Sequence, residues 1–289
     1  MRGLGDVTAS LRGSLQGSFR GSLRRSLRIW RRAALGRFVR PHAAPIFVLG
    51  NQKSGTTAIA ALLARMTGLR ATLDLRREID TPTFQRVHAG QWTMERFVER
   101  NRFDFSRDLI KEPNLTLLCG PLRDYFPQGR FVFVVRDPRQ CIRSILDRLG
   151  LPGNSSELNG EQLAGVSPAW RLVLDGRWMG LAGDQYVDLL AERWNRCARV
   201  YLDDPERFTL CRYEDFVRDR AGTIADLARA LSLPVLRDIS SEVESAFQPT
   251  GRHRHTPVEE FFGDNLDRVT RICADPMHAL GYSTEGTAT

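Results

Sequence analysis

The segment Gly50-Asn-Gln-Lys-Ser-Gly-Thr-Thr57 constrains the fold of this 289-residue chain more than any other. It follows residues 46–49, a short apolar run that predicts a buried strand, and it leads into residues 56–66, which predict a helix. A glycine-rich turn in this position directs backbone N–H groups and the positive end of the helix dipole toward one point. The loop therefore predicts a phosphate-binding site, with a plain strand-to-helix turn as the alternative.

The rest of the chain alternates between predicted strands and helices. This alternation is typical of an α/β fold, and we expect a three-layer P-loop-type architecture in which helices flank a central parallel sheet. We expect one folded domain over 45–282 and a disordered tail over 283–289. Further strands are predicted at 72–75, 131–135 and 208–211, and helices at 138–149, 186–203, 219–231 and 264–279.

Two segments depart from this rhythm. Residues 1–44 carry a Ser-Leu-Arg-Gly repeat with ten arginines and one acidic residue, so the net charge of +8 belongs to this tail. The tail predicts a disordered segment, a basic amphipathic segment for peripheral membrane contact, or a cleaved targeting peptide. Residues 150–185 are rich in Gly, Ser, Pro and Asn, and they predict a surface excursion or a lid over a substrate pocket.

The composition of the chain argues against several classes of protein. No apolar run reaches the roughly 18 residues of a membrane-spanning helix. A nearly neutral body gives no basis for nucleic-acid binding. The five cysteines form no Cys-x-x-Cys pair, which indicates reduced, buried thiols in a cytoplasmic protein and no zinc site. No other metal site is expected either. The cysteines are Cys119, Cys141, Cys197, Cys211 and Cys273.

The position of lysine in the glycine loop separates it from the Walker A pattern, in which lysine follows the second glycine. Here Lys53 precedes Gly55 by two residues. A second element, Arg136-Asp-Pro-Arg-Gln-Cys-Ile-Arg-Ser144, follows the predicted strand 131–135 and opens a helix. Arg136 offers a planar fork for a phosphate group, and Ser144 lies about two helical turns further along. An arginine–aspartate pair that caps the helix is the alternative.

These two elements resemble the 5′-phosphosulfate loop and the 3′-phosphate motif of the sulfotransferases that use 3′-phosphoadenosine 5′-phosphosulfate (PAPS). The resemblance covers roughly residues 45–282. It implies that Lys53, Ser54, Gly55, Thr56 and Thr57 bind the 5′ end of PAPS. Arg136 and Ser144 would then bind its 3′-phosphate.

Weaker matches extend the resemblance toward the C-terminus. The segment 212–215 resembles the stretch in which a tyrosine, here Tyr213, contacts adenine. The basic segment 251–255 resembles a closing loop, in which Arg252 or Arg254 would reach the 3′-phosphate.

The general base is the element in which the sequence departs from the pattern of the cytosolic members. Cytosolic members use a histidine in a Lys-x-His segment, but the corresponding Lys111-Glu-Pro113 has proline in that place. The Lys-x-Pro form resembles the glycan-acting branch, in which a glutamate after the second strand is the base. Glu78 matches that position and is predicted as the base, with a salt bridge to Arg76 or Arg77 as its alternative role. The acids Asp74, Asp80 and Glu112 are the other candidates.

The sequence thus predicts transfer of a sulfuryl group from PAPS to a hydroxyl of a carbohydrate, glycolipid or lipid. Lys53, Lys111 and Glu78 are the predicted catalytic residues, and no metal is implied. Lys53 and Lys111 are the only lysines in the chain. A nucleotide kinase or NTPase with a variant loop, and a non-catalytic module that binds membranes or nucleic acid, are the alternatives.

Overall fold

The computed structural model describes residues 35–244, 247, 252–253 and 255–285. Residues 1–34, which contain the arginine-rich repeat, and Arg254 lie outside the described residues. The last part of the predicted tail, residues 35–44, is described. The backbone N–H of His42 in this part donates to the carbonyl oxygen of Phe105 at 2.8 Å, so the chain contacts the domain before the first strand.

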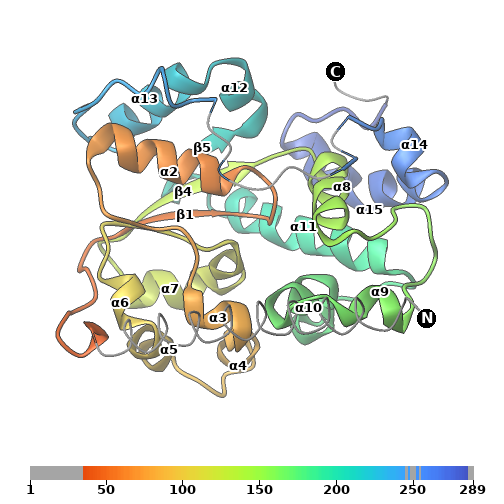
Figure 1. Cartoon of the computed structure of the whole chain (residues 1–289), viewed down its shortest axis with the longest axis horizontal. Helices are drawn as coiled ribbons and strands as arrows, with labels where there is room; N and C mark the ends of the chain where they lie inside the picture. Colours follow the sequence, from red (N-terminus) through yellow and green to blue (C-terminus); the bar gives the residue numbers. More distant parts are fainter. Residues whose placement is uncertain (1–34, 245–246, 248–251, 254, 286–289) are drawn as a thin grey trace, which may run out of the picture.

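A sheet of five parallel strands forms the centre of the molecule, in the order β2-β3-β1-β4-β5 (Figure 1). The first strand, β1, lies in the middle and pairs with β3 on one side and β4 on the other. Because the chain crosses from one side of β1 to the other, the loop after β1 lies where a parallel sheet binds ligands. The strands are β1 (Ile46–Gly50), β2 (Ala71–Thr72), β3 (Leu109–Lys111), β4 (Arg130–Val135) and β5 (Phe208–Arg212).

Helices cover both faces of the sheet. The side chains of each strand point alternately to the two faces, and each face is apolar and packs against its own set of helices. Ile46 and Val48 of β1 face the cluster that includes α2, α12 and α13. Phe47 and Leu49 face a larger cluster that includes α7, α8, α11 and α15 (Figure 1). These helices are α2 (Thr56–Thr67), α7 (Cys119–Tyr125), α8 (Pro138–Leu149), α11 (Tyr186–Leu202), α12 (Tyr213–Arg218), α13 (Arg220–Ala230) and α15 (Asn265–Ala279).

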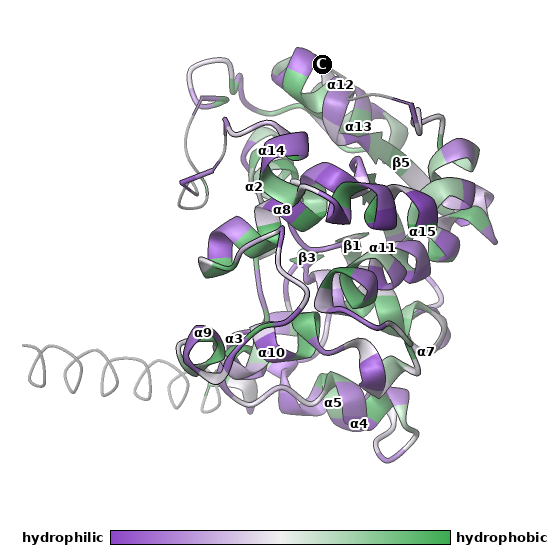
Figure 2. Cartoon of the chain, turned by 90° about the vertical axis from the view of Figure 1, so that its right-hand side faces the viewer, coloured by the Kyte–Doolittle hydropathy of each residue, from purple (hydrophilic) through white to green (hydrophobic). Residues whose placement is uncertain are grey.

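Short helices make up most of the remaining chain. Hydrophobic and hydrophilic stripes share the surfaces of the longer helices, which is the pattern expected of helices packed on a sheet (Figure 2). No helix of the described residues is long and apolar enough to cross a membrane. The short elements are α3 (Arg76–Asp80), α4 (Phe84–His88), α5 (Met94–Arg100), α6 (Arg102–Phe105), η1 (Pro113–Leu118), α9 (Gly160–Ala164), α10 (Pro168–Leu174), η2 (Gly176–Met179), η3 (Pro205–Arg207) and α14 (Val258–Phe262).

The structure confirms the predicted α/β class and most of its predicted elements. The predicted extent of the second strand, 72–75, is wrong, because β2 ends at Thr72 and helix α3 begins at Arg76. Strand β3 was missed, since it is only three residues long and ends in a lysine. All five cysteines are buried and none forms a disulfide.

Candidate active site

A cavity of about 570 Å³ lies at the carboxyl ends of the central strands. It joins the loop after β1 to the end of β3, the turn after β4 and one side of α8. This is the edge at which open parallel sheets bind ligands. Nine residues that the sequence singled out line this one cavity: Lys53, Gly55, Thr56, Thr57, Glu78, Lys111, Arg136, Ser144 and Tyr213.

The loop 50–55 owes its path to two glycines with positive φ. Gly50 has a φ of 139°, and a β-carbon there would lie 2.3 Å from the carbonyl oxygen of Val134. Thr116 fixes both backbone groups of Gly50, since its Oγ1 accepts from the N–H at 2.8 Å and donates to the carbonyl at 3.0 Å. Gly55, with a φ of 93°, is the N-cap of α2. No acidic side chain occupies the first turn of this helix, so its amino end keeps its affinity for an anion.

Lys53 lies in the same loop with a left-handed backbone, at a φ of 68°. Burial, together with the nearby guanidinium groups of Arg148 and Arg136, lowers the pKa of Lys53 to about 8. An anion that enters the cavity stabilises the charged form of an ammonium group that is buried among other cations. The low pKa of Lys53 therefore reflects the burial of its ammonium group first and the neighbouring guanidinium groups second.

Ser54 differs from its neighbours in the loop. Its Oγ lies 3.2 Å from the Sγ of Cys141, and the side chain is buried. Ser54 is not among the residues that line the cavity. Its hydroxyl therefore connects the loop to α8, and a contact with a ligand would come from its backbone.

Arg136 and Ser144 reach the cavity from the turn after β4 and from α8. The guanidinium of Arg136 lies 4.3 Å from the ring centroid of Tyr213, and its Nη1 donates to the carbonyl oxygen of Lys53 at 3.0 Å. These contacts link the two predicted phosphate elements directly. Arg143 and Arg148 line the same cavity from α8. Neither arginine was predicted. The spacing of four residues between Ser144 and Arg148 was a usable signal, because it places both on one helix face, whereas Arg143, adjacent to Ser144, carried no such signal.

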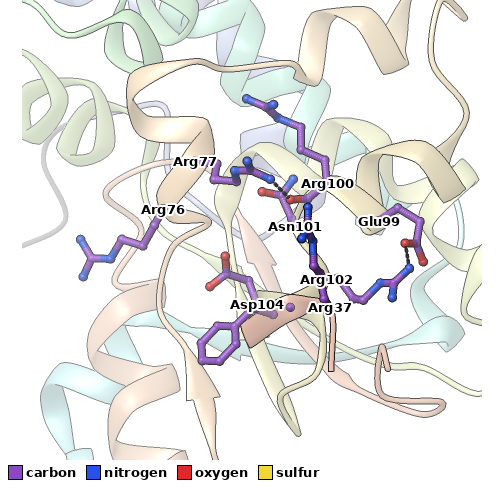
Figure 3. Close-up of a pocket in the computed structure, with 10 residues that line it drawn as sticks. Arg37, Arg76, Arg77, Glu99, Arg100, Asn101, Arg102 and Asp104 are labelled. Carbon is purple, nitrogen blue, oxygen red and sulfur yellow. Dashed lines mark hydrogen bonds and ion pairs between the residues drawn. The ribbon is translucent and has the colours of Figure 1, made fainter. Parts of the chain in front are cut away.

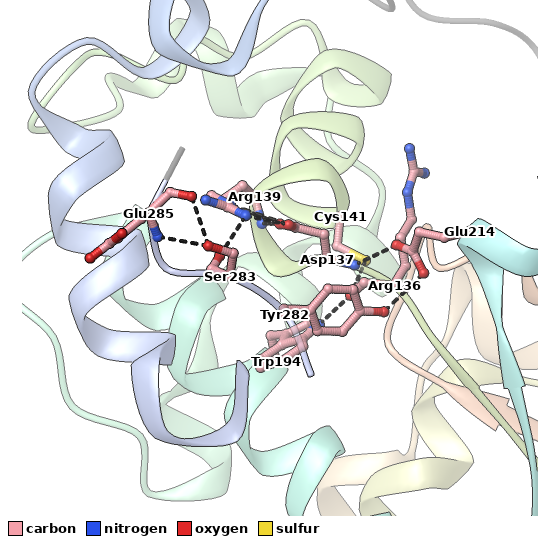
Figure 4. A network of polar contacts seen from close by, with 9 residues as sticks. All are labelled: Arg136, Asp137, Arg139, Cys141, Trp194, Glu214, Tyr282, Ser283 and Glu285. Carbon is pink, nitrogen blue, oxygen red and sulfur yellow. Dashed lines mark hydrogen bonds and ion pairs between the residues drawn. The ribbon is translucent and has the colours of Figure 1, made fainter. Parts of the chain in front are cut away.

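A polar network fixes the backbone around Arg136 (Figure 4). Trp194 donates from Nε1 to the carbonyl oxygen of Arg136 at 3.0 Å. Asp137 caps α8, and its own N–H donates to Glu214 at 3.0 Å. Tyr282 also donates to Glu214, at 3.0 Å. The turn that presents Arg136 is therefore held by three elements that are distant in sequence.

Tyr213 lies beside the glycine loop. A β-carbon at Gly55 would come within 2.2 Å of its Cδ2 atom, and the ring also contacts Phe216. The ring of Tyr213 thus contacts both Gly55 and the guanidinium of Arg136. Of the two candidate arginines in the closing loop, Arg252 is exposed and is not among the lining residues, whereas Arg254 lies outside the described residues.

Lys111 and Asp74 form a close ion pair in the cavity wall, with Nζ and Oδ1 2.5 Å apart. The lysine side chain is buried, whereas that of Asp74 is 37% exposed. Glu112, next to Lys111, is buried and accepts from the backbone N–H and the Nδ2 of Asn114 at 3.1 and 3.0 Å. Burial and the charge of Asp74 raise the pKa of Glu112 above the usual range of a carboxyl group.

Glu78 lines the cavity from α3, but its carboxylate is engaged on both oxygens. Oε2 accepts from the N–H and Oγ1 of Thr83, at 2.5 and 2.9 Å. Oε1 accepts from Arg100 and Asn101, at 3.2 and 2.9 Å. The side chain is only 1% exposed. The predicted alternative partner Arg77 instead donates to the carbonyl oxygen of Arg100 at 2.7 Å.

A second cavity, of about 310 Å³, lies on the other side of α3 (Figure 3). Arg100 and Asn101, which hold Glu78, belong to its wall, together with Arg76 and Arg77. Figure 3 shows Arg77 turned toward the backbone of Arg100 and Arg76 directed away from it. This cavity contains none of the phosphate-loop residues, so the larger cavity is the candidate active site.

Helix α10 contributes part of the wall of the larger cavity. Ala169, Trp170 and Val173 contribute to its lining. They belong to the segment 150–185, which the sequence analysis offered as either a lid or a surface excursion. Among the described residues, no group of three or more His, Cys, Asp or Glu side chains is arranged to hold a metal ion.

Comparisons with known proteins agree with this architecture. A sequence model described as the sulfotransferase family matches residues 76–238, which is more than half of the chain. The structure is similar to that of sulfotransferase STF9 from Mycobacterium avium, with a TM-score of 0.54 and 15% identity over 85% of this chain and 79% of that one. This likeness shows a shared fold.

Two further solved structures are more distant. Sulfotransferase STF1 from Mycobacterium tuberculosis H37Rv has a TM-score of 0.47 and 17% identity, over 86% of this chain and 81% of that one. The sulfotransferase domain from the curacin biosynthetic pathway has a TM-score of 0.49 and 15% identity, over 84% of this chain and 99% of that one. No curated protein matches the chain.

Proposed function

Because this chain belongs to the sulfotransferase family, we propose that it transfers a sulfuryl group from PAPS to an acceptor hydroxyl. One observation carries the proposal: the loop 50–57 and the pair Arg136 and Ser144, far apart in sequence, line the same cavity. A donor with a phosphosulfate at one end and a 3′-phosphate at the other requires two anion sites on one surface.

The proposed position of the donor follows from the two groups of cations. The 5′-phosphosulfate lies at the amino end of α2, where backbone N–H groups, Lys53, Thr56 and Thr57 surround it. The 3′-phosphate lies between Arg136 and Ser144, and Arg143 adds a further positive charge. Tyr213, beside both groups, supplies an aromatic face for the adenine ring.

The proposed reaction is an in-line displacement at sulfur. The acceptor oxygen forms a bond to sulfur while the bond between sulfur and the bridging phosphate oxygen breaks. The acceptor proton passes to a carboxylate, and 3′-phosphoadenosine 5′-phosphate (PAP) leaves with the electron pair. Lys53 neutralises the charge that develops on the bridging oxygen, in the way that preorganised donors stabilise transition states.

Asp74 is the base that the geometry favours over Glu78. Asp74 borders the cavity with more than a third of its side chain exposed, and Lys111 orients one of its oxygens. Glu78 would have to give up hydrogen bonds to Thr83, Asn101 or Arg100 before it could accept a proton. A general base must lie within hydrogen-bond reach of the proton that it removes. Glu78 nevertheless remains the residue that the family resemblance predicts.

The acceptor is proposed to bind beneath α10. Trp170 and Val173 give this part of the cavity an apolar surface, whereas the donor half is lined by cations. An apolar wall beside a carboxylate suits a hydroxyl on a carbohydrate, glycolipid or lipid, since sugar rings and acyl chains both present apolar faces.

The donor assignment can be tested by thermal unfolding of the full chain with candidate nucleotides. PAP is expected to raise the melting temperature in the presence of EDTA, because binding to the native state stabilises it. ATP with Mg²⁺ is expected to have little effect. The opposite pattern would favour a nucleotide kinase or NTPase and would overturn the proposal.

The acceptor assignment needs an activity measurement. Labelled PAPS incubated with glycans, glycolipids and hydroxylated lipids is expected to label at least one of these classes. Deletion of residues 1–44 is expected to leave PAP binding intact, because Gln52 is the first residue along the described part of the chain that lines the cavity. Loss of PAP binding in the deletion variant would contradict this placement of the donor.

A further inference from the structure

Arg193, on α11, is a cation that is completely buried, and no carboxylate of the described residues contacts it directly. Its Nε and Nη2 donate to Oε1 of Gln52 at 3.1 and 2.9 Å, and Nη2 also donates to Oδ1 of Asn114 at 2.8 Å. Its Nη1 lies 3.8 Å from the sulfur of Met179. All these partners are neutral, and burial lowers the pKa of Arg193. The carboxylate of Glu112 acts on the guanidinium through its charge without a direct contact, and a buried charge that lacks a direct ion pair costs stability.

The guanidinium of Arg193 determines the orientation of the side-chain amides of Gln52 and Asn114. Arginine has only donors, so the oxygens of Gln52 and Asn114 must point toward Arg193. Their NH₂ groups then point away from it. Gln52 Nε2 donates to Asn114 Oδ1 at 2.9 Å, and Asn114 Nδ2 donates to Glu112 Oε1 at 3.0 Å. A chain of hydrogen bonds with one direction therefore runs from Arg193 to Glu112.

This chain ends at the candidate active site. Gln52, Asn114 and Glu112 all line the large cavity, and Gln52 directly precedes Lys53. One N–H of the Gln52 amide is used by Asn114, so the second is available to the cavity that Gln52 borders. If the amide were reversed, its oxygen would face the anion site and would repel the donor.

We propose that Arg193 is a positioning residue that turns the Gln52 amide so that its N–H donates to an oxygen of the transferred sulfuryl group. The inference rests on the proposed function, because it assigns a role at the same site. Gln52 is then a further contact of the reacting group. Arg193 itself touches no substrate, and it acts through Gln52 and Asn114.

Replacement of the charge separates this role from a structural one. Arg193→Met removes the guanidinium at a similar volume but leaves the buried Oε1 of Gln52 without its donors, which costs about 1–3 kcal/mol. We expect a lower melting temperature together with a roughly 10–100-fold loss of kcat in sulfuryl transfer from PAPS. Arg139→Met provides the contrast, because Arg139 is also buried but pairs with Asp137 at 2.6 Å and does not line the cavity. Its loss is expected to lower the melting temperature as well, with a much smaller change in kcat.

Gln52→Glu tests the direction of the amide and keeps the inference open to refutation if Arg193→Met does not fold. Glutamate retains oxygen acceptors for Arg193 but has no N–H to offer the sulfuryl group. We expect a normal melting temperature and a fall of at least about 10-fold in kcat, since a lost donor to a developing charge affects the transition state.

The assay does not require a known acceptor. Water can take the place of the acceptor, and transfer is then measured as the release of labelled sulfate from PAPS. Wild-type kcat in both Arg193→Met and Gln52→Glu would overturn this inference and leave the proposed function intact. A wild-type protein that neither binds PAP nor consumes PAPS would overturn the proposed function, and this inference with it.

Discussion

The ring of Tyr213 lies so close to Gly55 that a β-carbon on the glycine would come within 2.2 Å of Tyr213 Cδ2. The same ring lies under the guanidinium of Arg136, at 4.3 Å from centroid to Cζ. Tyr213 thus connects the glycine loop to the arginine turn. Gly55 must be a glycine for two reasons, its φ of 93° and this contact.

Gly55→Ala is therefore expected to destabilise the protein by about 1–3 kcal/mol through backbone strain alone and to weaken PAP binding. Chemical denaturation and calorimetric titration with PAP measure the two effects. Tyr213→Ala in the same chain should restore part of the stability, because it removes the clash but not the strain. Gly120→Ala is the control, since a β-carbon there meets no atom within 4 Å. Equal losses in both glycine variants would contradict this explanation.

The pKa of Lys53 near 8 predicts a pH dependence of donor binding. The ammonium form attracts the anionic donor, so affinity for PAP is expected to be full below pH 8 and to fall as the pH rises above it. Titrations with PAP between pH 6.5 and pH 9.5 would show the decline. In Lys53→Arg the decline should disappear, because a guanidinium keeps its charge over this range. A decline of the same size in both proteins would show that another group titrates.

The two candidate bases predict different outcomes for matched amide variants. Asp74→Asn is expected to keep PAP binding while it lowers kcat by about 10²–10⁴-fold, and to lower the free energy of unfolding because it leaves the buried Lys111 without its carboxylate. Glu78→Gln is expected to lower the free energy of unfolding by about 1–3 kcal/mol, because it places an NH₂ group among donors that need an acceptor.

Kinetics and denaturation of the two variants decide between the carboxylates. Full stability with lost turnover in Glu78→Gln, and normal turnover in Asp74→Asn, would restore Glu78 as the base.

Ser144 is expected to act only on the 3′-phosphate. A hydrogen bond to a charged group contributes about 1.5–3 kcal/mol, so Ser144→Ala should weaken PAP binding roughly 10-fold or more. Binding of adenosine 5′-phosphate, which lacks the 3′-phosphate, should not change. Competition titrations with the two nucleotides provide the comparison. An equal loss for both would place Ser144 elsewhere on the donor.

Trp170 is expected to affect the acceptor and not the donor, because it lies on α10 with Val173, in the apolar part of the cavity where the acceptor is proposed to bind. Trp170→Ala should raise the KM for the acceptor and leave the affinity for PAP unchanged. The reverse result would show that α10 covers the nucleotide and that the acceptor enters from another side.

The sequence predicted those parts of the site that are built from residues close together along the chain. The loop 50–57 and the pair Arg136 and Ser144 are local patterns, in which a strand, a turn and a helix follow one another along the chain. Their positions at the edge of a parallel sheet follow from the order of elements. Strand β3 was missed because three residues carry too little periodicity.

The choice between Glu78 and Asp74 as the base could not be made from neighbouring residues in the sequence. Glu78 sits in helix α3, whereas the sequence placed it just after a strand predicted to end at residue 75, and residues up to 23 positions away in sequence complete its hydrogen bonds. The partner of Asp74 lies 37 positions away, and both carboxylates remain candidates from sequence spacing alone. Exposure and hydrogen-bond saturation, which separate them, arise only when the segments between α3 and β3 pack together.

The sequence by itself determined that this chain forms an α/β domain with an anion-binding loop at the amino end of a helix. A glycine pattern between an apolar strand and a helix permits little else. Only the tertiary structure decided which groups surround that loop. Arg193 lies 141 positions from Gln52, and nothing near either residue in sequence predicts that they meet. Burial then decides their chemistry, because a guanidinium without water must be satisfied by whatever oxygens the fold provides.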